Sequence, residues 1–141
     1  MKKQIALLVL FFFVVLQGCK KDDVEPDYSD KFAGVWKGVR VVQNGQTLNI
    51  KGVSSVSVTM TFTKIETNKV KMSFVAFVNG QTTTFAPEDI LPVKNLSTNI
   101  YELTLPTSSN GTGYITLDVN SGELKFGGFT GGSAFEYVFT K

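Results

Sequence analysis

The strongest constraint on how this chain can fold is an alternation of apolar and polar residues through residues 32–141. In the clearest run, Val58, Met60 and Phe62 alternate with serine and threonine. Successive side chains of a β-strand point to opposite faces, so a period of two places each apolar set on one face. Similar runs begin at Val70, Tyr101, Ile115 and Phe135. No stretch of this region has a helical period, and the pattern predicts one all-β domain.

The turn signals between these runs favour a sequence of hairpins. Asn44-Gly45, Asn79-Gly80 and Asn110-Gly111 are strong hairpin signals, because both residue types tolerate positive φ. About eight short antiparallel strands result, and sequential hairpins favour an up-and-down barrel. The segment 86–92 contains two prolines and is expected to lie outside any central strand. Further reversals are expected at 67–68 and 121–122, and between the glycine pairs 127–128 and 131–132.

The larger apolar residues of the first strand and of the alternating runs are candidates for the barrel interior and for the lining of a ligand site. They are Trp36, Val58, Met60, Phe62, Met72, Phe74, Tyr101, Leu103, Phe135, Tyr137 and Phe139. An eight-stranded barrel either holds one small ligand or fills its interior with side chains. The sequence leaves both possibilities open.

The first strand contains Gly34-Val35-Trp36-Lys37-Gly38. Its Gly-x-Trp motif resembles the opening of the lipocalin-like, or calycin, barrels. The resemblance implies an up-and-down barrel in which Trp36 plugs the closed end, beneath a basic side chain from late in the chain. Phe32 would add to the plug. The only arginine, Arg40, lies in the first strand, so the final residue, Lys141, would have to supply the late basic group.

Residues 1–18 have the three parts of a bacterial export signal. Two lysines follow the first methionine, and the apolar run 5–16 is too short to span a bilayer. The segment that follows, Leu16-Gln17-Gly18-Cys19, resembles a lipobox, the pattern that lipoprotein signal peptidase cuts between Gly18 and Cys19. The resemblance implies that Cys19 becomes an acylated, palmitate-type N-terminus and that the bilayer is its partner.

Residues 19–31 are rich in charge and lack hydrophobic periodicity, which predicts a flexible tether. Within them, Lys21, Asp22 and Asp23 resemble the signal that sends lipoproteins of the Bacteroidota to the cell surface. The resemblance implies a lipid-anchored position on the outer membrane, exposed at the cell surface, with a periplasm-facing position as the alternative. Because two of the 14 basic residues leave with the signal, 12 remain against 12 acidic residues. A neutral mature chain has no electrostatic basis for binding nucleic acid.

The chain contains no histidine, and its only cysteine is assigned to the lipid. These absences exclude histidine-based catalytic triads and the usual zinc sites. Carboxylates are the remaining catalytic option, and the candidates are Glu102, Asp118, Glu123 and Glu136. Glu102, Asp118 and Glu136 alternate with core residues and should face solvent. We therefore expect neither enzymatic activity nor a metal or other cofactor.

Two functions remain for a barrel of this kind. The first is binding of a small apolar ligand inside the barrel. The second is interaction with a protein or glycan, or inhibition of a partner, through the loops or outer face of a barrel with a filled core. Val75, Phe77 and Phe129 are apolar where a plain surface would be polar, and such residues can mark a contact patch.

Overall fold

The computed structural model describes residues 26–106, 111–130 and 132–141. One helical turn, α2 (Ser29–Phe32), precedes an all-β domain. The described strands are β1 (Gly34–Gln43), β2 (Gln46–Asn49), β3 (Val56–Glu66), β4 (Lys69–Val78), β5 (Gln81–Phe85), β6 (Ile90–Ser97), β7 (Ile100–Leu103), β8 (Gly111–Asp118), β9 (Glu123–Thr130) and β10 (Ser133–Thr140).

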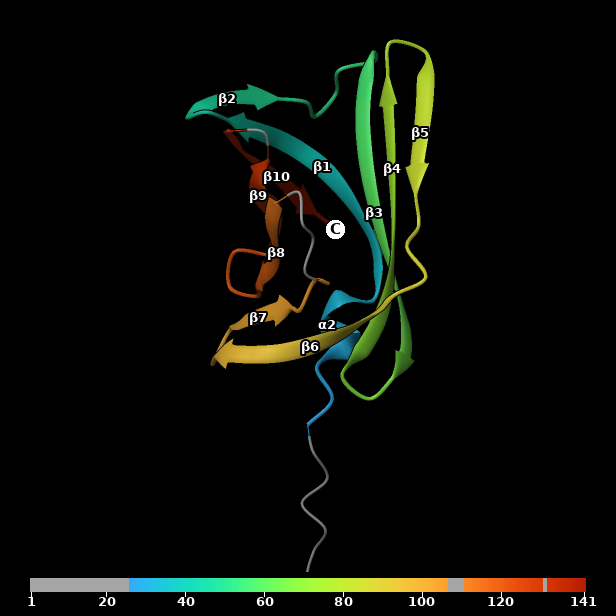
Figure 1. Cartoon of the computed structure of the whole chain (residues 1–141), viewed down its shortest axis with the longest axis vertical. Helices are drawn as coiled ribbons and strands as arrows, with labels where there is room; N and C mark the ends of the chain where they lie inside the picture. Colours follow the sequence, from blue (N-terminus) through green and yellow to red (C-terminus); the bar gives the residue numbers. More distant parts are fainter. Residues whose placement is uncertain (1–25, 107–110, 131) are drawn as a thin grey trace, which may run out of the picture.

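Eight of these strands form a closed antiparallel barrel (Figure 1). The ring runs β1, β3, β4, β6, β7, β8, β9 and β10, and β10 pairs with β1 to close it. The closing register places Lys37 opposite Thr140 and Gln43 opposite Phe135. Because neighbours in the ring follow one another along the chain, the order is up-and-down. The predicted fold class is confirmed.

The other two strands widen the barrel at one end. The first half of β1 pairs with β3, and its second half, from Arg40, pairs with β2 instead. In the same way β4 pairs with β6 through 69–71 and with the short strand β5 through 74–78. The walls therefore separate toward the turns at 44–45 and 79–80, as Figure 1 shows. We call this end the mouth, and the opposite end, which holds α2, the closed end.

The hairpin turns at the mouth follow the predicted chemistry. Asn44 has a φ of 48° and Gly45 of 80°, while Asn79 has 49° and Gly80 has 86°. Asparagine and glycine are the residues that adopt this left-handed region most readily, so the two Asn-Gly pairs turn tightly without strain. Asn110 lies outside the described residues.

Two predictions about the strands are wrong. Residues 90–92 belong to β6, with Pro92 opposite Lys69. A proline is tolerated there because β6 stops pairing with β4 at this point and begins to pair with β7. Val93 N donates to Asn68 O, and the Pro92 carbonyl accepts from Thr104 N. Residues 127–128 lie inside β9 and not beside a turn. They are glycines because neighbouring atoms occupy the space where a Cβ would stand.

The tether prediction also needs correction at its end. Residues 26–31 were assigned to a flexible tether, but they form α2 and the segment leading into it, packed on the closed end. Ser29 and Phe32 are fully buried. The carboxylates of Asp27 and Asp30 pair with Lys64 of the barrel. Residues 26–31 therefore belong to the folded domain, and residues 19–25 lie outside the described part of the chain.

Candidate functional site

The closed end of the barrel is filled by side chains. Phe32 and Phe62 meet edge-to-face with ring centroids 5.7 Å apart, and both are buried. Trp36 is buried beside them, and its Nε1 donates to the Phe32 carbonyl at 2.7 Å. The Lys141 ammonium lies 4.8 Å from the centre of the Trp36 ring and donates to the Lys31 carbonyl. The expectation that Lys141 covers the tryptophan is confirmed.

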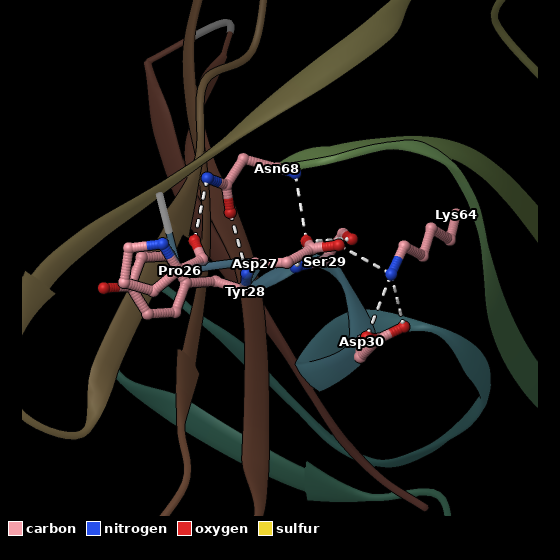
Figure 2. A network of polar contacts seen from close by, with 7 residues as sticks. All are labelled: Pro26, Asp27, Tyr28, Ser29, Asp30, Lys64 and Asn68. Carbon is pink, nitrogen blue, oxygen red and sulfur yellow. Dashed lines mark hydrogen bonds and ion pairs between the residues drawn. The ribbon is translucent and has the colours of Figure 1, made fainter. Parts of the chain in front are cut away.

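The segment from Pro26 to Phe32, which we call the strap, fastens this end through Asp27 (Figure 2). The Asp27 carboxylate pairs with the Lys64 ammonium at 2.6 Å and accepts from Ser29 Oγ at 2.5 Å and from Asn68 N at 3.0 Å. These donors favour the ionised form, so the pKa of Asp27 lies well below its ordinary value, with Lys64 as the largest cause. In turn, Asn68 Oδ1 accepts from Tyr28 N at 2.7 Å.

Above this plug, the inner face of the barrel is lined by side chains that are only half-buried. Four half-buried aromatic residues, Phe74, Phe126, Phe135 and Tyr137, come together from β4, β9 and β10. Phe126 lies 6.0 Å from Phe74 and 5.8 Å from Phe135, both edge-to-face. Tyr137 lies 6.3 Å from Phe126 in a stacked arrangement. Such spacings are typical of favourable aromatic pairs, and they make one continuous aromatic lining.

Three exposed apolar side chains extend this lining onto β2, the end of β4 and the free edge strand β5, whose exposed inner edge we call the rim of the mouth. The register places Phe85 opposite Phe74 and Leu48 opposite Val41, so each shares the inner face with a residue packed on the core. Phe85 nevertheless remains 58% exposed and Leu48 63% exposed. Val78, the last residue of β4, is exposed as well. An apolar face that the described residues leave uncovered is a candidate contact for an apolar ligand.

The polar groups on this upper inner face are uncharged. By register, the residues sharing the face at the mouth are Val41, Gln43, Gln46, Leu48, Val56, Phe74, Ala76, Val78, Gln81, Thr83, Phe85, Phe126, Gly128, Ser133, Phe135 and Tyr137. None of these described residues carries a charge. Amide and hydroxyl groups can orient a ligand by hydrogen bonds, but a charged ligand would find no counter-ion among them.

A hollow of about 540 Å³ lies against the β1–β2 hairpin at the rim, and Val41, Gln46 and Leu48 are among its lining residues. Its lining consists of six residues of this one hairpin, and none of the four residues of the aromatic lining borders it. A second hollow, of about 410 Å³, lies where β1 leaves β3, with Lys37 and Lys51 in its lining. The first hollow adjoins the uncharged mouth, whereas the second lies beside charged side chains of the barrel wall.

The four carboxylates considered as catalytic groups take part in separate contacts. Glu123 forms a two-pronged ion pair with Arg40, at 3.0 and 3.1 Å. Glu136 accepts from the Tyr114 hydroxyl at 2.5 Å, and burial together with this bond raises the pKa of Tyr114 to about 12. Asp118 caps its own turn by accepting from Asn120 N, and Glu102 stands opposite Lys94 and Thr116 on the sheet. Among the described residues no three potential metal ligands cluster together.

The predicted interior residues divide between the two zones. Eight are buried in the packed core: Trp36, Val58, Met60, Phe62, Met72, Tyr101, Leu103 and Phe139. The other three, Phe74, Phe135 and Tyr137, are half-buried and belong to the lining itself. The proposed lipidation and export residues, from Gly18 to Asp23, lie outside the described part of the chain.

The sequence analysis missed Leu48, Phe85 and Phe126 as site residues. Phe126 had a usable signal, since Leu124 and Phe126 alternate with Glu123 and Lys125. Leu48 and Phe85 had none, because each is the only large apolar residue of a short polar strand. Their place on the inner face follows from pairing with β1 and β4, which the local pattern does not reveal.

Comparison with known proteins adds no relative. No protein-family model matches the chain, and no curated protein matches it. Across the parts that the structure describes, no helix has the length and apolar character needed to cross a membrane.

Proposed function

We propose that this chain is a lipoprotein, anchored to the outer membrane through Cys19, whose barrel binds a small, uncharged, apolar ligand at its mouth. The observation that carries the ligand proposal is the aromatic lining, which continues to the exposed Phe85 and Leu48 at the rim. In a filled barrel with no ligand, these side chains would gain stability by packing inward. A ligand in the mouth would instead remove them from water, at about 25 cal/mol per Å² of apolar surface.

The uncharged inner face narrows the ligand class. Burying a charge without a partner costs several kcal/mol, and no described inner residue at the mouth offers a counter-ion. Aromatic rings favour flat apolar groups by offset and edge-to-face contacts. Gln43, Gln46 and Thr83 would provide the few hydrogen bonds that orient such a ligand.

Binding can be tested with the uncharged probe N-phenyl-1-naphthylamine, whose fluorescence rises in apolar surroundings. The protein is produced from Lys20 onward, because a lipid-bearing sample in detergent would itself take up the probe. Phe85→Ser should weaken probe binding roughly tenfold, as expected for the loss of one aromatic contact worth about 1.4 kcal/mol. Equal denaturation midpoints would show that the variant folds normally.

Phe129→Ser is the matched control. Phe129 is 54% exposed, nearly the same as Phe85, but the register places it on the outer face, opposite Ala134 and Thr112. Probe binding should be unchanged in this variant. If the wild-type barrel binds no probe, or if both variants lose binding equally, the mouth is not an apolar ligand site. An effect at Phe129 alone would favour the alternative, a contact patch for a protein or glycan on the outer face.

Anchoring and surface display are tested separately in cells. Incorporation of an alkyne-labelled palmitate should depend on Cys19, and Cys19→Ala should abolish both the label and membrane sedimentation. Continued membrane attachment of Cys19→Ala would contradict the anchor. For display, alanine in place of Lys21, Asp22 and Asp23 together should protect the barrel from protease added to intact cells. Equal cleavage with and without the three substitutions would count against the export signal.

A further inference from the structure

The chain enters the barrel at its closed end, and the strap determines where that entry point lies (Figures 1 and 2). Asp27 and Tyr28 are held by Lys64 and Asn68, which lie at the end of β3 and in the β3–β4 turn. The Tyr28 ring packs on Tyr101 at 5.1 Å. The first described residue, Pro26, is itself fixed, because its carbonyl accepts from Asn68 Nδ2 at 3.0 Å.

The strap leaves only a short tether between Cys19 and the fixed point at Pro26. Seven residue steps reach at most about 25 Å when fully extended. Strand β4 runs from the closed end to the mouth over 10 residues, or about 33 Å along the strand at the usual rise per residue. Because barrel strands are tilted by about 35–45° from the axis, this length corresponds to a height of about 25 Å, which is the whole reach of the fully extended tether.

We infer that the strap sets the orientation of the barrel on its membrane, with the closed end toward the bilayer and the mouth away from it. The inference rests on the proposed lipid anchor at Cys19. To bring the mouth onto the bilayer, the tether would have to be stretched to its limit of about 25 Å along the full height of the barrel. A tether running to Phe32 would extend to about 45 Å and would permit that inverted position. The contacts of the strap remove this freedom.

This orientation identifies the side from which a ligand enters. The rim residues Leu48 and Phe85 and the two Asn-Gly turns are held away from the anchoring bilayer. An apolar ligand therefore reaches the mouth from the surrounding water or from a partner molecule, and not by lateral transfer from the membrane that holds Cys19. The mouth of the barrel therefore faces away from the membrane, and the plugged end faces the lipid.

The orientation can be measured by energy transfer from the barrel to the membrane. Apart from Cys19 the chain has no cysteine, so Thr67→Cys in the β3–β4 turn and Thr82→Cys on β5 each give one labelling site. The full lipidated protein is inserted into phosphatidylcholine vesicles that carry a trace of acceptor dye on the lipid headgroup. Transfer should be several times more efficient from position 67 than from position 82.

Equal transfer from the two positions, or greater transfer from position 82, would overturn the orientation. Absence of transfer from both, with protein that does not float with the vesicles, would instead overturn the lipid anchor and the orientation with it. These failures are distinguishable because flotation is measured on the same samples.

A second pair of variants tests whether the strap is the cause. Asp27→Ala combined with Asn68→Gly removes the contacts that hold Pro26, Asp27 and the Tyr28 backbone to the β3–β4 turn and to Lys64, while glycine preserves the positive φ of 55° at position 68. The difference in transfer between positions 67 and 82 should shrink in this variant. Asp89→Ala, on an exposed connection remote from the strap, is the control and should leave the difference unchanged. An undiminished difference in the strap variant would show that the strap does not set the orientation.

Discussion

Replacing Gly127 with alanine should destabilise the barrel, because two neighbouring groups occupy the space of the missing side chain. A Cβ at this position would lie 2.5 Å from Tyr114 Oη and 2.7 Å from the Phe135 carbonyl oxygen. The Tyr114 hydroxyl is held by its bond to Glu136, and the carbonyl belongs to the backbone of β10. The tyrosine can withdraw only by giving up this bond, and the carbonyl cannot withdraw without disturbing the sheet.

The expected cost follows from the size of the overlap. Inserting an extra methyl group into a well-packed site costs about 1–3 kcal/mol, and backbone contact places this case near 2 kcal/mol. That is a large fraction of the 5–15 kcal/mol that typically separates folded from unfolded protein. For a domain of this size, the melting temperature should fall by about 8–10 °C.

Urea denaturation followed by the emission of Trp36 measures the change directly. The control is Gly113→Ala on the adjacent strand β8, where the new Cβ would meet the flexible Leu105 Cδ1 at 3.1 Å and could be accommodated by a small rotation. Its midpoint should fall by less than half as much. If the two alanine variants unfold at the same urea concentration, or if Gly127→Ala unfolds like wild type, the packing argument fails.

Three further predictions concern ionisable groups. The lowered pKa of Asp27, which faces Lys64 and Asp30, stabilises the fold above about pH 4, and this contribution disappears as the pH falls. In denaturant titrations Asp27→Asn should therefore be less stable than wild type at neutral pH, and its free energy of unfolding should fall less between pH 6 and pH 3. Parallel curves of stability against pH for the two proteins would contradict this. Because the pKa of Tyr114 is raised to about 12, its contribution is present below about pH 10 and is lost as the pH rises. Ultraviolet titration should show one late tyrosine that is missing in Tyr114→Phe, and an unchanged titration would refute the assignment. Lys141→Met should cost about 0.5–1 kcal/mol by removing the cation over Trp36, and should shift Trp36 emission; identical spectra and midpoints would exclude the contact.

Much of the fold could be predicted from the sequence, because a strand with one buried face alternates apolar and polar residues along the chain. The alternation around Met60 and the Asn-Gly turns at 44–45 and 79–80 were enough to predict an antiparallel up-and-down barrel. Trp36 and its late basic partner Lys141 followed from a resemblance, and the structure brings them together. These features are local in sequence or belong to a known pattern.

The remaining features depend on which strands pair with one another, and the local sequence pattern does not indicate this. Pro92 is tolerated within a strand because β6 changes its pairing partner there. Position 127 of β9 is a glycine because the Tyr114 side chain occupies the space of a Cβ. The strap looked like a solvated linker, since its charges find Lys64 and Asn68 only after the chain has folded back across 34 or more residues.

The division between the two levels is clearest at the mouth. The sequence by itself determined that this chain forms a β-barrel with an apolar inner face, because period-two alternation has one physical solution when that face must leave water. Only the tertiary structure decided that the lower half of this face is packed and the upper half is open. That difference arises because β2 and β5 replace the ring neighbours of β1 and β4 and spread the walls apart. The β1–β2 and β4–β5 hairpins occupy strand edges that would otherwise continue the ring, and Leu48 and Phe85 are left in the open as a result.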